Sequence, residues 1–255
     1  FPMSKSSIFI AKHANINIIN QIRNIIKSKI KQEDKFLNLN NEKYRDIILD
    51  IQNELNDKEY GIKIVNEIKT AICKYLRTKS FLIQSNLYLR ATRPILEKTI
   101  NKKINTESID FHRESFYGSN MEKSVNIWTP IKGVNNKNTL RYIPESHLIN
   151  EKSIKVKNIK NKSVSRFSSG HKLGFQYSPK KIVGGVDLAN SKKMNIKLGH
   201  SSIFSGNLIH GAAINESKQI RFSCDFRVIR KKDYSTKNKI FHFASGKPYF
   251  IDFKS

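Results

Sequence analysis

Cysteines, acidic residues and long apolar runs are all scarce in this 255-residue chain. The two cysteines, Cys73 and Cys224, are far apart, in segments with a helical and a strand pattern. We expect both to be reduced and buried, which excludes a small disulfide-stapled domain. No apolar run is long enough to span a membrane, and the N-terminus lacks the pattern of a secretory signal peptide. These absences predict a cytoplasmic protein without a transmembrane segment.

The shortage of acidic residues leaves 21 Asp and Glu against 47 Lys and Arg, a formal net charge of +26. Such an excess favours an anionic partner: a nucleotide- or carrier-linked substrate, nucleic acid or a membrane surface. The basic residues are scattered, however, with only short clusters at 155–162 and 230–232, and aromatic residues are not interleaved with them. Lysines on every solvated surface are therefore the simpler interpretation. We expect an anionic small-molecule substrate and do not expect nucleic acid; the oligomeric state is not predicted.

The N-terminal part of the chain has a helical hydrophobic period. Isoleucines at three- and four-residue steps predict an amphipathic helix over 15–34, and similar patterns predict helices over 42–56 and 59–77. We expect residues 3–79 to form a helical scaffold outside a barrel. A separate helical binding domain is the alternative.

From Ser80 the hydrophobic period changes to two, which indicates β-strands. Many short strands after N-terminal helices favour a mainly β fold, a double-stranded β-helix (jelly-roll, cupin-like) barrel over 80–253. We therefore expect residues 1–255 to form one domain, with a final edge strand or barrel cover within 240–253. The predicted strands lie at 81–91, 107–117, 124–131, 139–144, 182–188, 194–198, 202–206, 207–213 and 219–229.

His112 and Glu114 are candidate metal ligands. They lie two residues apart in a segment rich in aromatic residues and β-formers, and alternate residues of a strand point to the same side. Both can therefore reach one ion, and His210 offers a third ligand from a later strand-like run. Two imidazoles and one carboxylate form the facial triad that holds ferrous iron and leaves coordination positions open.

Two further segments extend this pattern. Residues 139–147 are similar to an element Gly-Thr-Leu-x-x-Ile-Pro-Gly-Ser-His, with Asn138 and Glu145 where glycines are usual. Residues 210–221 are similar to a block His-Gly-(Ser/Ala)-x-x-Asn that ends in an arginine eleven residues after the histidine. With His-x-Glu, these blocks occur in the order typical of Fe(II)/2-oxoglutarate oxygenases. Over residues 80–230 the chain resembles their phytanoyl-CoA dioxygenase-like branch.

The resemblance implies a dioxygenase that uses Fe(II), 2-oxoglutarate and O2 to hydroxylate an unactivated C–H bond of a sugar, amino-acid or natural-product intermediate. His112, Glu114 and His210 would be its catalytic iron ligands. The carboxylate is Glu where Asp is commoner, so its arm is longer. Because the carboxylate is retained, halogenation is not expected.

Arg221 is the candidate for binding the co-substrate. In strand 219–229 it shares one face with Ser223, Asp225 and Arg227, and the other face is apolar. An arginine that points into a barrel needs a carboxylate partner, and the distal carboxylate of 2-oxoglutarate would be one. Ser223 would donate to the same group. Asp225 is the alternative, internal partner.

Other candidate residues follow from the resemblance. Trp128 would form a wall of the co-substrate pocket, and Asn126 or Gln84 would bond the carboxylate near the iron. The polar segment 148–181 matches an insertion that lies over the metal as a lid. The candidate substrate contacts, each also interpretable as a solvated or structural residue, are Arg141, His147, Arg166, His171, Lys172 and Tyr177.

Two other functions fit parts of the pattern. Arg221 and Arg227 have the spacing of AlkB-like nucleic-acid demethylases, but the Asn-x-Tyr signature of that group is missing and its histidine lies further from its first arginine. A metal-binding jelly-roll isomerase, or a basic binding module, is the non-oxygenase alternative. An inward-facing Arg221 would argue against it.

Overall fold

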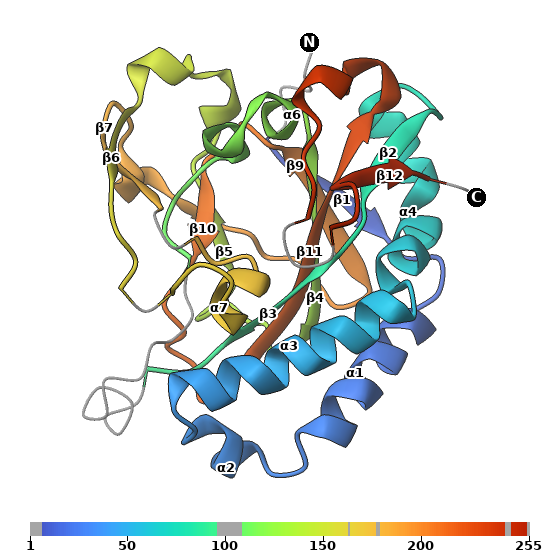
Figure 1. Ribbon diagram of the computed structural model, residues 1–255, viewed down its shortest axis with the longest axis vertical. Coiled ribbons are helices and arrows are strands. Elements are labelled where there is room, and N and C mark those ends of the chain that lie inside the picture. Colours follow the sequence, from blue (N-terminus) through green and yellow to red (C-terminus); the bar gives the residue numbers. More distant parts are fainter. Residues whose placement is uncertain (1–6, 96–108, 163, 177–178, 243–245, 254–255) are drawn as a thin grey trace.

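The computed structural model describes residues 7–95, 109–162, 164–176, 179–242 and 246–253 (Figure 1). The protein is mainly antiparallel β-sheet with helices along one side of the largest sheet. No helix among these residues is both long and apolar enough to cross a membrane.

The largest sheet has the strand order β1-β9-β4-β11-β2-β12. Strand β11 is its centre, because β4 pairs with one edge of β11 while β3 and β2 share the other edge. The strands of this sheet are β1 (Phe9–Lys12), β2 (Phe81–Gln84), β3 (Tyr88–Thr92), β4 (Val125–Lys132), β9 (His200–Ser205), β11 (Arg221–Arg230) and β12 (Phe250–Asp252).

Two smaller sheets lie on the side away from α1 and α4 (Figure 1). One has the order β10-β5-β8 and the other pairs β6 with β7. Their strands are β5 (Leu140–Tyr142), β6 (Lys155–Asn158), β7 (Lys180–Gly184), β8 (Lys192–Lys193) and β10 (His210–Ala212). The predicted lid segment 148–181 therefore contains regular structure, which its weak periodicity does not indicate.

Helices cover the apolar face of β11. The α-helices are α1 (Asn17–Lys29), α2 (Glu33–Leu37), α3 (Asn41–Asp57), α4 (Tyr60–Leu76), α6 (Ser119–Glu122) and α7 (Ser169–Lys172). The isoleucines of α1 and α4 pack with Phe222, Cys224 and Phe226 in one core cluster. Each fully buried side chain of this kind stabilises the fold by roughly 1.5–3 kcal/mol, so this interface fixes which face of β11 turns inward.

The remaining helical turns are of the 3₁₀ type, and one of them positions Glu114. They are η1 (Glu114–Tyr117), η2 (Ser146–Leu148), η3 (Glu151–Ser153), η4 (Leu188–Asn190), η5 (Lys231–Asp233) and η6 (Thr236–Asn238).

Several predicted boundaries were wrong. The predicted strand 107–117 is, over the described residues, a single bridge between His112 and His210 followed by η1. The chain turns there because Phe116 N–H donates to the carbonyl of Arg113 instead of to a neighbouring strand. Strand 81–91 is two strands, segment 194–198 is not a strand, and helix 15–34 ends at Lys29. The N-terminal part also contributes β1 to the sheet, so it is more than a helical scaffold.

Candidate functional site

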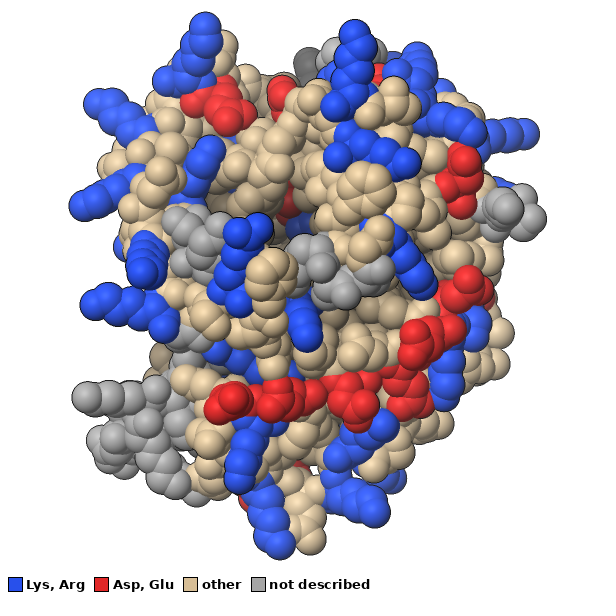
Figure 2. Space-filling model, in the orientation of Figure 1, with Lys and Arg blue, Asp and Glu red and all other residues tan. Residues whose placement is uncertain are grey.

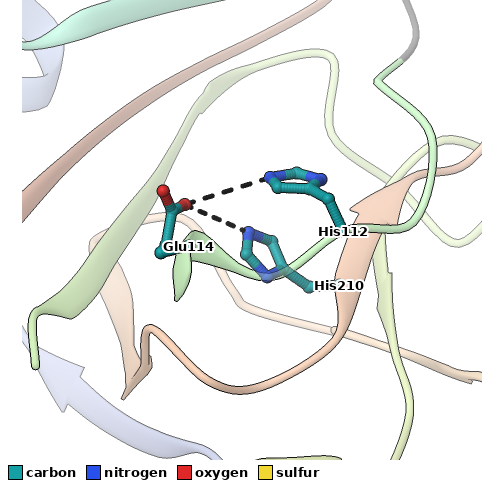
Figure 3. A group of neighbouring side chains, drawn as sticks. All are labelled: His112, Glu114 and His210. Atoms are coloured by element: carbon teal, nitrogen blue, oxygen red, sulfur yellow. Dashed lines mark ion pairs between the residues drawn. The ribbon is translucent and has the colours of Figure 1, made fainter. Parts of the chain in front are cut away.

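Three side chains meet on the inner side of β11, and no other such group of His, Cys, Asp or Glu occurs in the described part of the chain (Figure 3). The Nε2 atoms of His112 and His210 lie 3.9 and 3.8 Å from Oε1 of Glu114. His112 and His210 are joined by two backbone hydrogen bonds of 2.9 and 3.0 Å. Glu114 N–H then donates to the carbonyl of Gly206 at 2.7 Å, which brings the carboxylate to the same side.

The second nitrogen of each imidazole fixes its tautomer. Nδ1 of His112 donates to the carbonyl of Asp110 at 2.8 Å, and Nδ1 of His210 donates to that of Leu208 at 2.9 Å. The lone pair of each Nε2 therefore faces Glu114. Burial lowers the pKa of both rings, that of His210 to about 4, so both are neutral near pH 7 and able to bind a metal.

Glu114 is fully buried yet ionised. Burial would raise the pKa of its carboxyl, but the charge of Arg227, followed by His112, outweighs burial and lowers the pKa to about 2. Arg227 Nη2 donates to Oε1 at 2.7 Å. Oε2 has no hydrogen-bond partner among the described residues. One carboxylate with a free oxygen and two neutral imidazoles is a donor set that fits a divalent transition metal such as Fe(II).

The three side chains lie between two cavities that share His112, Arg90, Ile109 and Arg227 as lining residues. The larger has a volume of about 500 Å³, and the smaller about 50 Å³. Residues from two segments line the larger cavity: Asn161, His171, Gly174, Phe175, Gln176 and Pro179, and Ile240, Phe241, His242 and Tyr249. The first set lies in the segment predicted as a lid, whose role over the metal stays a prediction, and in the C-terminal segment β12 is an edge strand on β2.

Arg221 lines the smaller cavity and is 2% exposed. Its Nη1 donates to the carbonyl of Asn138 at 2.8 Å and its Nη2 to Oγ1 of Thr92 at 2.7 Å, while Nε has no partner within the described residues. Burial lowers its pKa to about 10, and the nearby charge of Arg90 acts in the same direction.

Asp225 is not the partner of Arg221. Its two carboxylate oxygens accept hydrogen bonds from Nε and Nη2 of Arg90, at 2.6 and 3.2 Å. Within the described chain no carboxylate is paired with Arg221, so its buried charge has no counter-ion there.

Of the other predicted co-substrate residues, some line the smaller cavity and some do not. Asn126 and Trp128 line the smaller cavity, because they stand opposite Arg227 and Asp225 in the pairing of β4 with β11. Ser223 is fully buried opposite Arg90, and its hydroxyl has no partner among the described residues. Gln84 lines neither cavity at the metal group. Its amide oxygen accepts from Nη1 of Arg227 at 3.0 Å instead.

Of the predicted substrate contacts, His171 lines the larger cavity. Arg141 donates to the carbonyl of Ser191, the guanidinium of Arg166 lies over the ring of Phe167, and the carbonyl of Lys172 accepts from Gln52. His147 is buried in η2. None of these four lines either cavity, so their roles as substrate contacts stay predictions. Tyr177 lies outside the described residues.

Three features of the site were missed in the sequence. The contact of Arg227 with Glu114 and the pairing of Arg90 with Asp225 join residues that are distant in the chain. Alternation along β11 did place Arg227 on the correct face, and its spacing from Arg221 was the available signal. The third feature is His242 in the cavity wall, which no local motif marks.

Glu145 and Asn138, which stand where the family element usually has glycine, have different structural roles. Glu145 has φ of +59°, a left-handed conformation that glycine adopts without cost. Asn138 instead uses its side chain: Nδ2 donates to Gly133 and Ser217, and Oδ1 accepts from the backbone of Asn135. This turn holds the Asn138 carbonyl that Arg221 contacts.

Figure 2 shows lysine and arginine spread over the whole viewed face instead of collected in one stripe. A row of acidic side chains crosses this face along α3, whose sequence carries Glu42, Asp46, Asp50, Glu54 and Asp57. On this side the surface offers no continuous basic track for a nucleic-acid backbone.

A family model described as phytanoyl-CoA dioxygenase (PhyH) matches residues 23–223. Among solved structures, the chain is similar to EvdO2 from Micromonospora carbonacea var. aurantiaca, complexed with 2-oxoglutarate, at 12% identity and a TM-score of 0.55, with 91% of each chain covered. It is also similar to apo ThoJ, a non-heme monooxygenase, at 13% identity and a TM-score of 0.53, covering 89% of this chain and 75% of that one. The epimerase SnoN, in complex with Fe3+, alpha ketoglutarate and nogalamycin RO, has 11% identity and a TM-score of 0.50, with 98% and 95% covered. No curated protein sequence matches the chain.

Proposed function

We propose, because the chain belongs to the phytanoyl-CoA dioxygenase family, that it is a dioxygenase that hydroxylates an unactivated C–H bond of a small molecule. Its cofactors are Fe(II) and 2-oxoglutarate. The observation that carries the proposal is the meeting of two imidazole Nε2 atoms and one carboxylate near the buried Arg221, which has no carboxylate partner among the described residues. When bound, iron and 2-oxoglutarate supply the oxidising chemistry, in which O2 is consumed and 2-oxoglutarate becomes succinate and CO2.

We infer that the sheet β10-β5-β8 and the large sheet are the two halves of a double-stranded β-helix. Antiparallel pairing throughout and the likeness to EvdO2 support this assignment. In such a fold the inward residues of both sheets enclose the site. The position of His210 on β10 and of Arg221 on β11 agrees with that arrangement.

The residues of the site have distinct roles in this proposal. His112, Glu114 and His210 hold the iron and leave positions open for other ligands. Arg221 binds the distal carboxylate of 2-oxoglutarate, while Thr92 and Asn138 keep its guanidinium in place. This arrangement favours an oxygenase over an isomerase or a basic binding module, which would have no use for a buried arginine that has no carboxylate partner among the described residues.

Trp128 and Asn126 complete the small cavity. Trp128 forms a wall, and Nδ2 of Asn126, which has no partner among the described residues, is available to a carboxylate beside the iron. Ser223, buried opposite Arg90 in the pairing of β3 with β11, lines neither cavity, so its bond to the co-substrate stays a prediction. Because Gln84 is engaged by Arg227, we no longer assign it to the co-substrate.

The larger cavity is the proposed substrate site. Its volume of about 500 Å³ is typical of pockets for small molecules. Five tyrosine and phenylalanine rings are among its lining residues, no lysine lines it among the described residues, and Arg90 and Arg227 are already paired with carboxylates. A ring-bearing molecule therefore fits better than a highly phosphorylated one. An anionic group, which the net charge favours, would face His171 or His242.

Succinate formation tests the proposal directly. Protein loaded with Fe(II) is mixed with 2-oxoglutarate under air, and succinate is measured by mass spectrometry. We expect succinate from the wild type and none above background from His210→Ala, with His200→Gln, outside both cavities, as the matched control. Equal succinate from His210→Ala and the wild type would contradict the assignment of the site.

A further inference from the structure

Glu114 must be oriented by its surroundings. Glutamate has one more rotatable side-chain bond than aspartate, so a carboxylate on this longer arm has more ways to point away from the imidazoles. Its backbone is fixed by the hydrogen bond to Gly206, but that contact does not reach the carboxylate. Among the described residues only Arg227 donates a hydrogen bond to the carboxylate itself.

Arg227 is held on the side away from Glu114. Its Nη2 donates to Glu114 Oε1 at 2.7 Å, while its Nη1 donates to Gln84 Oε1 at 3.0 Å and to the hydroxyl of Tyr249 at 3.4 Å. The planar guanidinium therefore connects the carboxylate to two neutral groups, Gln84 on β2 and Tyr249 just before β12. A point charge on a flexible stem would not make these contacts together.

A second set of contacts joins Arg227 to the lid. Its Nη1 lies 3.8 Å from Oδ2 of Asp225, which is bound by Arg90. Arg90 Nη1 donates to the carbonyl of Leu173, within segment 148–181, at 2.6 Å. Charges of alternating sign thus run from Glu114 to the lid, and each restricts the next.

We propose that Arg227 is a positioning residue of the metal site, which holds the Glu114 carboxylate toward His112 and His210. This inference rests on the proposed function. Oε1, the oxygen that Arg227 holds, is also the one that lies 3.9 and 3.8 Å from the two imidazole Nε2 atoms, so the guanidinium fixes the edge of the carboxylate that faces them. Hydrogen bonds orient the ligands of other metal sites in the same way.

Arg227 has two opposing effects on a bound cation. Its orientation of Glu114 strengthens binding, whereas its positive charge repels a divalent ion. Arg227→Lys separates the two effects, because lysine keeps the charge but loses the planar fork that spans Glu114 and Gln84. A loss of affinity in this variant therefore reports orientation.

The test measures binding of Co(II) alone, followed by its d–d absorption bands, to the full chain without oxygen or 2-oxoglutarate. We expect Arg227→Lys to bind Co(II) about tenfold more weakly, or worse, with altered bands, since loss of an orienting partner typically costs 10–100-fold in metal affinity. Arg93→Lys is the matched control. Arg93 is also a buried arginine, but it donates to Leu39 and Asn41 and lines neither cavity, so the Co(II) affinity and bands of this variant should equal those of the wild type.

Wild-type Co(II) affinity and bands in Arg227→Lys, or tighter binding, would overturn the inference while leaving the metal site intact. A wild type that does not bind Co(II), or His210→Ala that binds it equally well, would overturn the proposed function as well. If circular dichroism shows that Arg227→Lys is unfolded, Gln84→Leu is tested in its place. It removes the acceptor behind Arg227 without changing any charge, and we expect several-fold weaker Co(II) binding; unchanged binding would overturn the inference.

Discussion

The two buried arginines of β11, Arg221 and Arg227, differ in the groups that they contact. Both side chains are buried on the same face of the strand. Arg227 meets the Glu114 carboxylate at 2.7 Å, and its Nη1 donates to neutral acceptors. Arg221 meets only a carbonyl and a hydroxyl and, within the described structure, no carboxylate; the Nε of each arginine has no partner there.

The difference separates a buried charge that has a counter-ion from one that has none among the described residues. A buried ion pair stabilises little compared with apolar packing, but removing one partner costs much, because the other charge stays buried. A buried charge without a partner is costly from the start. The charge of Arg227 is therefore neutralised within the fold, whereas in the proposed function the cost of burying Arg221 would be offset by the carboxylate of 2-oxoglutarate.

The largest expected effect is on stability. Arg227→Met leaves the charge of Glu114 buried without its cation, so we expect the free energy of unfolding to fall by about 3–5 kcal/mol. Arg221→Met removes a charge that has no counter-ion, at the loss of two hydrogen bonds to neutral groups. We expect a change within about 1 kcal/mol. Urea unfolding of the ligand-free, chelator-treated protein measures both. Equal destabilisation by the two substitutions would contradict the distinction between an ion-paired Arg227 and an Arg221 without a counter-ion.

The sequence carried enough information to predict the residues that meet at the site, because they belong to spaced motifs. His112, Glu114, His210 and Arg221 were identified by type and spacing, and the structure brings them to one pair of cavities. Alternation along β11 also predicted which side chains face inward. Their roles as ligands stay predictions.

Local patterns did not reveal the partners. Strand β3 lies beside β11 with Tyr88 opposite Asp225 and Arg90 opposite Ser223, so Arg90 is near enough to bond Asp225. This pairing of strands decides that Asp225 binds Arg90 and not Arg221. The β-formers around His112 predicted a strand, but two hydrogen bonds to His210 and a turn into η1 prevailed. In the lid, composition could not separate solvated residues from His171, which lines the cavity.

The second prediction concerns the co-substrate. If Arg221 binds the distal carboxylate through charge-assisted hydrogen bonds, Arg221→Met should weaken 2-oxoglutarate binding about 100-fold. Calorimetric titration of Mn(II)-loaded protein without oxygen measures this. Pyruvate, which lacks the distal carboxylate, is the control ligand, and the substitution should leave its affinity unchanged. An equal loss of affinity for both acids would mean that Arg221 acts through the fold and not through the diacid.

The smallest expected effect is on the pH dependence of stability, which Arg227→Met should change and Arg221→Met should not. The pKa of Glu114 is lowered from 4.5 to about 2, so the unfolded chain binds more protons between these values and stability falls as the pH drops through that range. The pKa of His210 is lowered from 6.5 to about 4, which gives a fall of the same sign at higher pH.

Arg227→Met removes the main charge that lowers the pKa of Glu114. The fall below pH 4.5 should therefore shrink in this variant, while the fall between pH 6.5 and 4 persists, and Arg221→Met should retain both. Urea midpoints from pH 7 to pH 3 measure the difference. A stability gap between wild type and Arg227→Met that stays constant below pH 4.5 would show that ionised Glu114 does not depend on Arg227.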